Sequence, residues 1–353
     1  MARPIRLGIV GCGRVTASRH LPALQRVSAI EVVALADTDL ELGKKLSAQY
    51  RIPHTFSSVE ALLDSAEVDA VAVCVPARFH EEVALPILHA RKALFIEKPL
   101  ALSVDSCFQI IRAAEQNSCI ALVGFNLRWH RLVLEARERL SEGVTGAIEL
   151  ISGINSSGSR REDMPDWRFD TQLGGGLLKE QAIHMFDLWR YLLGCEIQEV
   201  HAFMRSETAA VIMGKAENGA QITFGFSEHS VQRMELQLLG DLGCLELNCY
   251  RMDGLVFQSR PQAPGNFAFR FKSFVYGVAQ MMSHPSVILA GGDFVQSYEN
   301  EWRHFAECIR KNQKTGCGLN EGLRAIEILE AVLQSAQEER PVTVRCHPVS
   351  LAI

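Results

Sequence analysis

Over residues 5 to 123, short and continuously apolar runs alternate with amphipathic stretches, and this alternation constrains the fold more than any other feature. A strand with one face in water alternates apolar and polar residues, whereas a strand that is apolar throughout belongs to a parallel sheet covered on both faces. The runs with this character are IRLGIVG, EVVALAD, VDAVAVCVP, ALFIEKP and IALVGF. The pattern predicts a doubly wound α/β domain, a Rossmann-type parallel sheet, over residues 1–123.

After residue 124 the apolar pattern changes to a period of two. Four segments alternate in this way and end in turn residues: EVHAFMRS, TAAVIMGKA, AQITFGFSEH and RMELQLLG. Such segments predict an open, mostly antiparallel sheet with one face on a core. Helices are expected around LVLEARERL, from Leu178 to Leu193, and at ENEWRHFAECIRK and EGLRAIEILEAVLQSAQ, whereas QSRPQAPGNFAFRF is expected to be a loop. Residues 124–353 are therefore expected to form a second, α+β domain.

Charge and cysteine usage exclude several classes of partner. The net charge is -5 and no run of five or more like charges occurs, which argues against a nucleic-acid partner. No apolar stretch approaches the roughly 20 residues of a membrane helix, and the N-terminal apolar run is broken by glycines, unlike a signal peptide. None of the ten cysteines forms a C-x-x-C pair, so we expect reduced thiols, no metal site and a soluble, cytoplasmic protein.

The first strand ends in Gly11-Cys12-Gly13-Arg14-Val15-Thr16 and leads into a helix. Two glycines at this point allow a tight turn whose N–H groups approach a pyrophosphate at a helix N-terminus. The third glycine of the fingerprint is replaced by Thr16. The second strand ends in Asp37, where a carboxylate would bind ribose hydroxyls and repel a 2′-phosphate. NAD is therefore favoured as the cofactor, with NADP left open because Arg14 is near.

A charged pair, Glu97-Lys98, stands at the carboxyl end of a predicted strand and is followed by Pro99. Ligands of open α/β sheets bind at this edge. A lysine beside a cofactor can hydrogen-bond a reacting hydroxyl or relay its proton. A surface ion pair at a strand end is the alternative interpretation, and these residues alone do not decide between the two.

On the predicted helix after Gly174-Gly175-Gly176, Glu180 and His184 are spaced i, i+4 and share one face. A histidine near neutral pKa can accept a hydroxyl proton, and a nearby carboxylate, such as Asp187 one turn further on, would orient the ring and make it more basic. The alternative is a histidine satisfied within the core.

Taken together, these segments resemble the Gfo/Idh/MocA oxidoreductase family (glucose–fructose oxidoreductase and inositol dehydrogenase) over nearly the whole chain. The matching stretches are GIVGCG, VDAVAVCVP to His80, EKP at 97–99, GFNLRW at 124–129 and GGGLLKEQAIHMFDLWRYLLG at 174–194. The resemblance implies an enzyme whose first domain binds a nicotinamide dinucleotide and whose second serves substrate binding and oligomerisation. It also implies that Lys98 and His184 form the catalytic pair, while Glu180 stands where that family usually has aspartate.

The expected site follows from these assignments. The residues expected around the cofactor are Gly11, Gly13, Arg14, Val15, Asp37, Pro76, His80, Glu97 and Lys98. The candidates for substrate binding are Asn126 and Arg128, near the domain junction, and Asp163 and Trp167, in a polar loop. The expected reaction is hydride transfer to or from a secondary alcohol carbon of a sugar, cyclitol or sugar derivative, in a homodimer or homotetramer. A non-catalytic sensor and an NAD-recycling glycosidase of the same fold remain alternatives.

Overall fold

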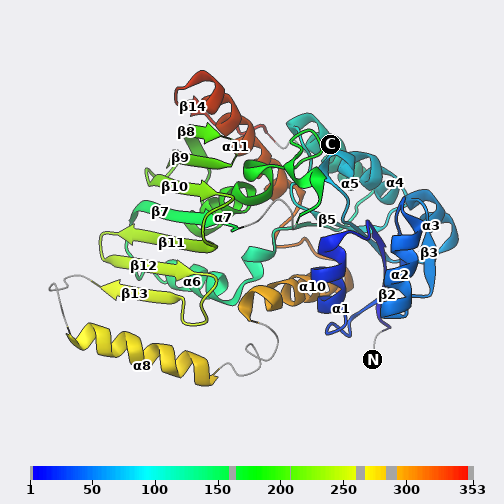
Figure 1. Cartoon of the computed structure of the whole chain (residues 1–353), viewed down its shortest axis with the longest axis horizontal. Helices are drawn as coiled ribbons and strands as arrows, with labels where there is room; N and C mark the ends of the chain where they lie inside the picture. Colours follow the sequence, from blue (N-terminus) through cyan, green and yellow to red (C-terminus); the bar gives the residue numbers. More distant parts are fainter. Residues whose placement is uncertain (1–2, 159–163, 207, 260–266, 284–291, 349–353) are drawn as a thin grey trace.

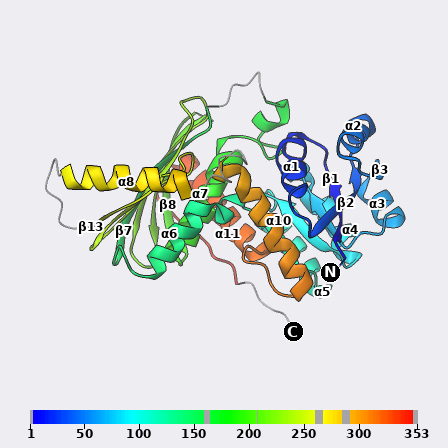
Figure 2. The same cartoon turned by 90° about the horizontal axis from the view of Figure 1, so that it is seen from below.

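The structure, a computed structural model, describes residues 3–158, 164–206, 208–259, 267–283 and 292–348. It contains two sheets with helices between them, and the two views show the same arrangement (Figures 1 and 2). The first sheet is built by the N-terminal third of the chain, and the second by its middle part together with β14 (Val342–Thr343) near the C-terminus.

All six strands of the first sheet are parallel, and their order is β3-β2-β1-β4-β5-β6. The strands are β1 (Ile5–Val10), β2 (Ile30–Ala36), β3 (His54–Phe56), β4 (Ala70–Val73), β5 (Ala93–Glu97) and β6 (Ala121–Gly124). The helical segments are η1 (Thr16–His20), α1 (Leu21–Leu24), α2 (Leu40–Tyr50), α3 (Val59–Ser65), η2 (Ala77–Phe79), α4 (His80–His89) and α5 (Val104–Gln116). The predicted doubly wound sheet is confirmed, and its strand order reverses between β1 and β4, where such sheets bind ligands.

The second sheet has eight strands in the order β13-β12-β11-β7-β10-β9-β8-β14. They are β7 (Ile148–Ser156), β8 (Ile197–Ser206), β9 (Ala209–Ala216), β10 (Gln221–Ser227), β11 (Arg233–Gly240), β12 (Gly243–Asn248), β13 (Leu255–Ser259) and β14 (Val342–Thr343). Neighbouring strands pair antiparallel except β7 and β10, which confirms the predicted, mostly antiparallel sheet. The later helices are η3 (Asn126–Trp129), α6 (Arg131–Ser141), η5 (Asp166–Phe169), η6 (Leu178–Ala182), α7 (Ile183–Leu193), α8 (Phe267–Ser283), α10 (Asp293–Lys311) and α11 (Leu319–Glu338).

The prediction of a loop over QSRPQAPGNFAFRF is wrong at its end, because helix α8 begins at Phe267. Residues 260–266 lie outside the described part of the chain. Phe267, Phe271 and Phe274 recur at helical spacing. The two prolines and the glycine before them are typical of a loop, and for that reason the whole segment is predicted as a loop.

Helix α10 packs against the first sheet although it comes late in the chain. Its Trp302 stacks on Phe95 of β5 with ring centroids 4.2 Å apart, and both side chains are fully buried. This contact carries Tyr298, one turn earlier on the same helix, to the carboxyl edge of the sheet. Within the described residues, no helix combines the length and apolar character needed to cross a membrane.

Candidate active site

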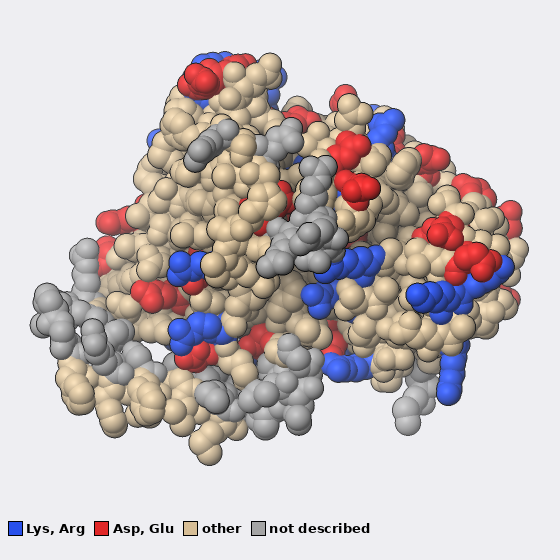
Figure 3. Space-filling view, viewed as in Figure 1, with Lys and Arg blue, Asp and Glu red and all other residues tan. Residues whose placement is uncertain are grey.

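A cavity of about 1270 Å³ lies at the carboxyl ends of β1, β2, β4 and β5 and extends toward η6 and α7. Residues predicted for the site line it from both halves of the chain. They are Gly11, Gly13, Arg14, Val15, Asp37, Pro76, Glu97, Lys98, Asn126, Trp167, Glu180 and His184. The space-filling view shows Lys and Arg side chains gathered in the middle of one face, between the two sheets (Figure 3).

Gly11 makes the turn after β1 that the cofactor fingerprint requires. Its φ is +99°, and a Cβ built there would lie 2.4 Å from the carbonyl oxygen of Cys74, so no other residue fits without moving the backbone. A Cβ at Gly13 would meet no atom within 4 Å, so this side of the turn is open. Thr16, in place of the third glycine, donates its hydroxyl to the Gly11 carbonyl at 2.6 Å and thereby holds the turn.

Asp37 follows β2 and lines the same end of the cavity. One carboxylate oxygen accepts the Cys12 N–H at 2.6 Å, and the other accepts the Asp39 N–H at 2.8 Å. These bonds hold the carboxylate beside the glycine turn, as a contact with a ribose requires. The turn and this carboxylate fit a dinucleotide.

The expectation for His80 is wrong in its detail, because His80 is buried and does not line the cavity. Its Nε2 lies 2.9 Å from the carbonyl oxygen of Val75, and its Nδ1 lies 3.3 Å from that of Leu100. Burial lowers the pKa of this imidazole. His80 therefore supports the backbone that presents Pro76 to the cavity.

Lys98, Glu180 and Arg168 form a loose charged group in the cavity wall. Lys98 Nζ donates to the Glu180 carbonyl at 3.2 Å and lies 3.5 Å from the Glu180 carboxylate. Arg168 Nε is 3.8 Å from the same carboxylate. The Glu180 carboxylate thus lies between two cations, at distances that leave room for a ligand to compete.

His184 shares the wall with Lys98 and Glu180, and its ring lies edge-on to Phe125 at 6.1 Å. Its Nδ1 is buried with no hydrogen-bond partner. Burial, and next the Lys98 ammonium, lower the pKa of the imidazole to about 3, against an opposing effect of Glu97. The ring is therefore neutral at physiological pH and can accept a proton.

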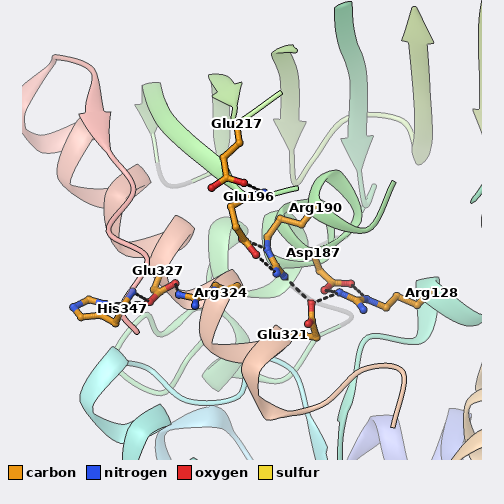
Figure 4. Close-up of polar contacts among 9 residues, drawn as sticks. All are labelled: Arg128, Asp187, Arg190, Glu196, Glu217, Glu321, Arg324, Glu327 and His347. Atoms are coloured by element: carbon orange, nitrogen blue, oxygen red, sulfur yellow. Dashed lines mark hydrogen bonds and ion pairs between the residues drawn. The ribbon is translucent and has the colours of Figure 1, made fainter. Parts of the chain in front are cut away.

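The expectation that Asp187 orients His184 and makes it more basic is wrong. Both Asp187 oxygens accept from Arg128, at 2.7 Å and 2.5 Å, and Arg128 also donates to Glu321 at 2.8 Å. Arg190 continues the network to Glu196 and Glu321, as Figure 4 shows. A carboxylate held bidentate by a buried guanidinium is not available to the imidazole.

The same network removes Arg128 from the candidates for substrate binding. Its side chain is 6% exposed and does not line the cavity, because Asp187, Glu321 and the Gly316 carbonyl hold its guanidinium in the core. The sequence places Arg128 at a strand end, but these partners lie 59 to 193 residues away and could not be seen from it.

Of the other three candidates for substrate binding, two line the cavity. Asn126 lines the cavity while its Nδ2 donates to Ser297 Oγ at 2.9 Å. Trp167 also lines the cavity, from η5. Asp163 lies outside the described residues. In the part of the chain that the structure describes, no group of three or more His, Cys, Asp or Glu side chains is placed to hold a metal ion.

Several cavity residues were missed by sequence analysis. Arg168 stands beside Trp167 in the polar loop and could have been included on that ground. Asn155, Tyr250 and Tyr298 lie on a strand, a turn and a late helix and carry no local signal. The fold alone brings them to the cavity.

Comparison with known proteins identifies the class of protein to which the chain belongs. Residues 5–125 match the oxidoreductase family with an NAD-binding Rossmann fold, and residues 133–246 match the GFO/IDH/MocA C-terminal domain. The glycine turn, Asp37 and these matches define an NAD-binding oxidoreductase. The chain belongs to the Gfo/Idh/MocA family.

Similar proteins cover the whole chain. The uncharacterized oxidoreductase YrbE of Bacillus subtilis is 26% identical over 98% of both chains. The inositol 2-dehydrogenase of Rhizobium meliloti is 25% identical over 96% of this chain and 99% of that protein. The WlbA dehydrogenase from Bordetella pertussis, solved with NADH and UDP-GlcNAcA, superposes with a TM-score of 0.79 at 20% identity, covering 98% of this chain and 99% of that one.

Proposed function

We propose that this oxidoreductase transfers a hydride between NAD and a carbon bearing a secondary hydroxyl, or the matching ketone, of a sugar, cyclitol or sugar derivative. One observation carries the proposal: Lys98, Glu180 and His184 line the same cavity as Gly11, Gly13 and Asp37. This arrangement supports a reaction in which a proton-handling group and a dinucleotide turn serve one cavity.

The turn at Gly11 and Gly13 would hold the pyrophosphate, with Arg14 and Val15 beside it, and Asp37 would hold the adenosine ribose. When bound, the nicotinamide supplies the hydride acceptor or donor. Pro76, Glu97 and Lys98 would lie at its reactive end. NAD is favoured over NADP, because Asp37 would repel a 2′-phosphate and Thr38 and Asp39 offer no guanidinium.

The roles of the side chains follow from their charge states. His184 is neutral, so it accepts the hydroxyl proton as the alcohol is oxidised. The Lys98 ammonium hydrogen-bonds the substrate oxygen and stabilises the negative charge that develops on it. Glu180 holds Lys98 in place through contacts at 3.2 Å and 3.5 Å.

The substrate class rests on the cavity and on a relative. Trp167 offers a ring face for stacking on a sugar, and Asn126 offers an amide for its hydroxyls; Asp163 is kept as a further candidate. A relative named inositol 2-dehydrogenase covers nearly the whole chain, which favours a polyhydroxylated ring.

The test is a screen of cyclitols, sugars and sugar derivatives for NADH formation, followed by absorbance, with NADP as the second cofactor. We expect turnover with at least one polyol, and loss of turnover in Lys98→Ala and His184→Ala with NAD binding retained. Tight NAD binding without turnover on any compound would favour a sensor. Release of a cleaved glycoside without net NADH would favour an NAD-recycling glycosidase.

We also propose that residues 1–123 serve as the cofactor domain and residues 124–353 as the substrate and oligomerisation domain, in a homodimer or homotetramer. The outer face of the second sheet supports this, because Ile154, Phe203, Val211 and Met213 are each at least 40% exposed there. Monomers rarely expose a continuous apolar patch of this kind. Light scattering coupled to gel filtration measures the state directly, and a monomer at micromolar concentration would contradict it.

A further inference from the structure

Behind Lys98, three buried side chains form a chain that the proposed reaction leaves unused. They are Glu97 at the end of β5, His20 at the end of η1 and Trp302 in α10. His20 Nε2 lies 2.9 Å from Glu97 Oε1, and Trp302 Nε1 lies 3.2 Å from His20 Nδ1. His20 and Trp302 are fully buried, and Glu97 is 7% exposed.

Elementary chemistry fixes the direction of both bonds. An indole N–H only donates, so His20 Nδ1 accepts from Trp302 and carries no proton. The ring proton is then on Nε2, which donates to Glu97. A doubly protonated imidazole has no lone pair for Trp302, so Trp302 holds His20 in the neutral tautomer. Phe95 and Tyr298 pack edge-on against the ring, at 5.4 Å and 5.5 Å, and exclude water.

Glu97 is satisfied on both oxygens. Oε1 accepts from His20, and Oε2 accepts the backbone N–H of Lys98 at 3.0 Å. Burial would raise the pKa of Glu97, but the contacts with His20, and next the charge of Lys98, hold it below its ordinary value. Glu97 is therefore a buried anion directly behind Lys98.

The other titratable groups that face Glu97 do not replace His20. They are Cys74 just after β4, His80 on α4, and Tyr298 and Glu301 on α10. Burial, and next Glu97 itself, raise the pKa of Glu301 well above its ordinary value, so that carboxyl is neutral. Outside the cavity, His20 is thus the group that satisfies the Glu97 carboxylate.

We propose that His20 and Trp302 are positioning residues for Lys98: Trp302 fixes the tautomer of His20, His20 orients the Glu97 carboxylate, and Glu97 holds the backbone of Lys98. This inference rests on the proposed function for its effect on turnover, but not for its effect on the tautomer. Neither residue touches the cavity, so each acts through its neighbour.

The sharpest variant is Trp302→Phe, which removes the N–H and keeps a ring against Phe95. Trp189→Phe is the matched control, because Trp189 is also fully buried but its N–H has no acceptor. In Trp302→Phe, His20 Nδ1 loses its donor, so the ring proton is no longer held on Nε2. The ring can then present an Nε2 without a proton to Glu97, and we expect kcat to fall with KM for NAD unchanged, whereas Trp189→Phe keeps the wild-type values.

A second pair of variants separates the hydrogen bond from the packing. His20→Leu leaves Glu97 without its donor, and we expect kcat to fall about 10- to 100-fold with KM for NAD unchanged. His20→Gln retains an N–H donor, and we expect it to recover part of that loss. If His20→Leu does not fold, Trp302→Phe still tests the proposal.

Two-dimensional NMR of the histidine ring nitrogens provides a readout that needs no turnover. We expect His20 in the wild type to carry its ring proton on Nε2 with Nδ1 accepting a hydrogen bond, and we expect the Nδ1 signal to lose this hydrogen-bond signature in Trp302→Phe. Absence of turnover with this tautomer intact would count against the proposed function only. A wild-type His20 whose ring proton is not on Nε2 alone, or a Trp302→Phe variant whose kcat equals that of the wild type, would overturn the proposal.

Discussion

Two groups of charged side chains lie within two turns of each other along η6 and α7, and their geometry differs sharply. Toward the cavity, Glu180 is 3.5 Å from Lys98 and 3.8 Å from Arg168, and His184 Nδ1 has no partner. Toward the core, Asp187 and Arg128 form two bonds of 2.5 Å and 2.7 Å. The cavity group (Lys98, Arg168, Glu180 and His184) has hydrogen-bonding atoms without close partners. In the core group (Arg128 and Asp187), the carboxylate oxygens are both bound by the guanidinium.

The difference separates residues that react from residues that position them. A saturated ion network holds its helix in one place, while groups with spare hydrogen-bonding capacity can bind a ligand. Asp187 follows His184 by three residues, so the clamp to Arg128 and Glu321 fixes the helix one turn from the reacting histidine. The substitutions at His184, Arg128 and Glu180 below each change one group and leave the other intact.

The largest effect is expected from His184→Ala. Loss of a proton acceptor lowers kcat about 10²- to 10⁴-fold, and NAD binding, followed by fluorescence, is retained. His89→Ala, an exposed histidine at the end of α4, is the control and keeps wild-type turnover. Equal turnover in the two variants would remove His184 from the reaction.

The core group is tested by Arg128→Met, which leaves Asp187 buried without its partner. We expect the free energy of unfolding to fall by about 3–5 kcal/mol in urea titrations. Combining it with Asp187→Leu removes both charges and is expected to restore much of the loss, since a buried pair replaced by apolar residues is often neutral. Lys44→Met, which breaks an exposed pair with Glu41, leaves stability almost unchanged. An Arg128→Met variant as stable as Lys44→Met would contradict the contrast.

The cavity group could be predicted from sequence because its signals are local. Glu180 and His184 share a helix face by their spacing, and Lys98 stands at a strand end beside a proline. A helix face and a strand edge are properties of a few consecutive residues, so the pattern locates Lys98, Glu180 and His184. It does not decide between a catalytic and a structural role for them, and it misses Arg168.

The core group could not be predicted for the opposite reason. Arg128 has the same local appearance as a substrate-binding arginine, and only its distant partner Glu321 shows that it is structural. Asp187 stands one turn from His184, which suggested a contact that Arg128 takes instead. Tyr298 reaches the cavity only because Trp302 packs under β5.

His130 is a buried histidine whose two ring nitrogens both have hydrogen-bond partners, unlike those of His184. Its effect on stability can be measured as a function of pH. His130 Nδ1 accepts the Leu132 N–H at 3.2 Å and Nε2 donates to the Cys249 carbonyl at 3.1 Å, so burial lowers its pKa to about 4. Between about pH 6.5 and this value the unfolded state binds more protons, and stability falls as the pH falls. From pH 7 to 5 we expect this group to cost about 2 kcal/mol. Thermal unfolding of His130→Gln should show a weaker pH dependence; an unchanged slope would exclude His130 as the cause.

The smallest effect is expected from Glu180→Asp, which shortens the side chain by one methylene. The carboxylate keeps its charge but moves away from Lys98 and Arg168 by about one bond length, and contacts of 3.5 Å and 3.8 Å are weak at the outset. We expect kcat to fall about two- to fivefold, the scale of a partly exposed ion pair. Glu180→Gln keeps the length and removes the charge, so it leaves two cations without a carboxylate and should lower kcat further. If Glu180→Gln turned over like the wild type while Glu180→Asp did not, reach rather than charge would be what Glu180 contributes. The cavity group would then be a steric support for Lys98 and not an electrostatic one.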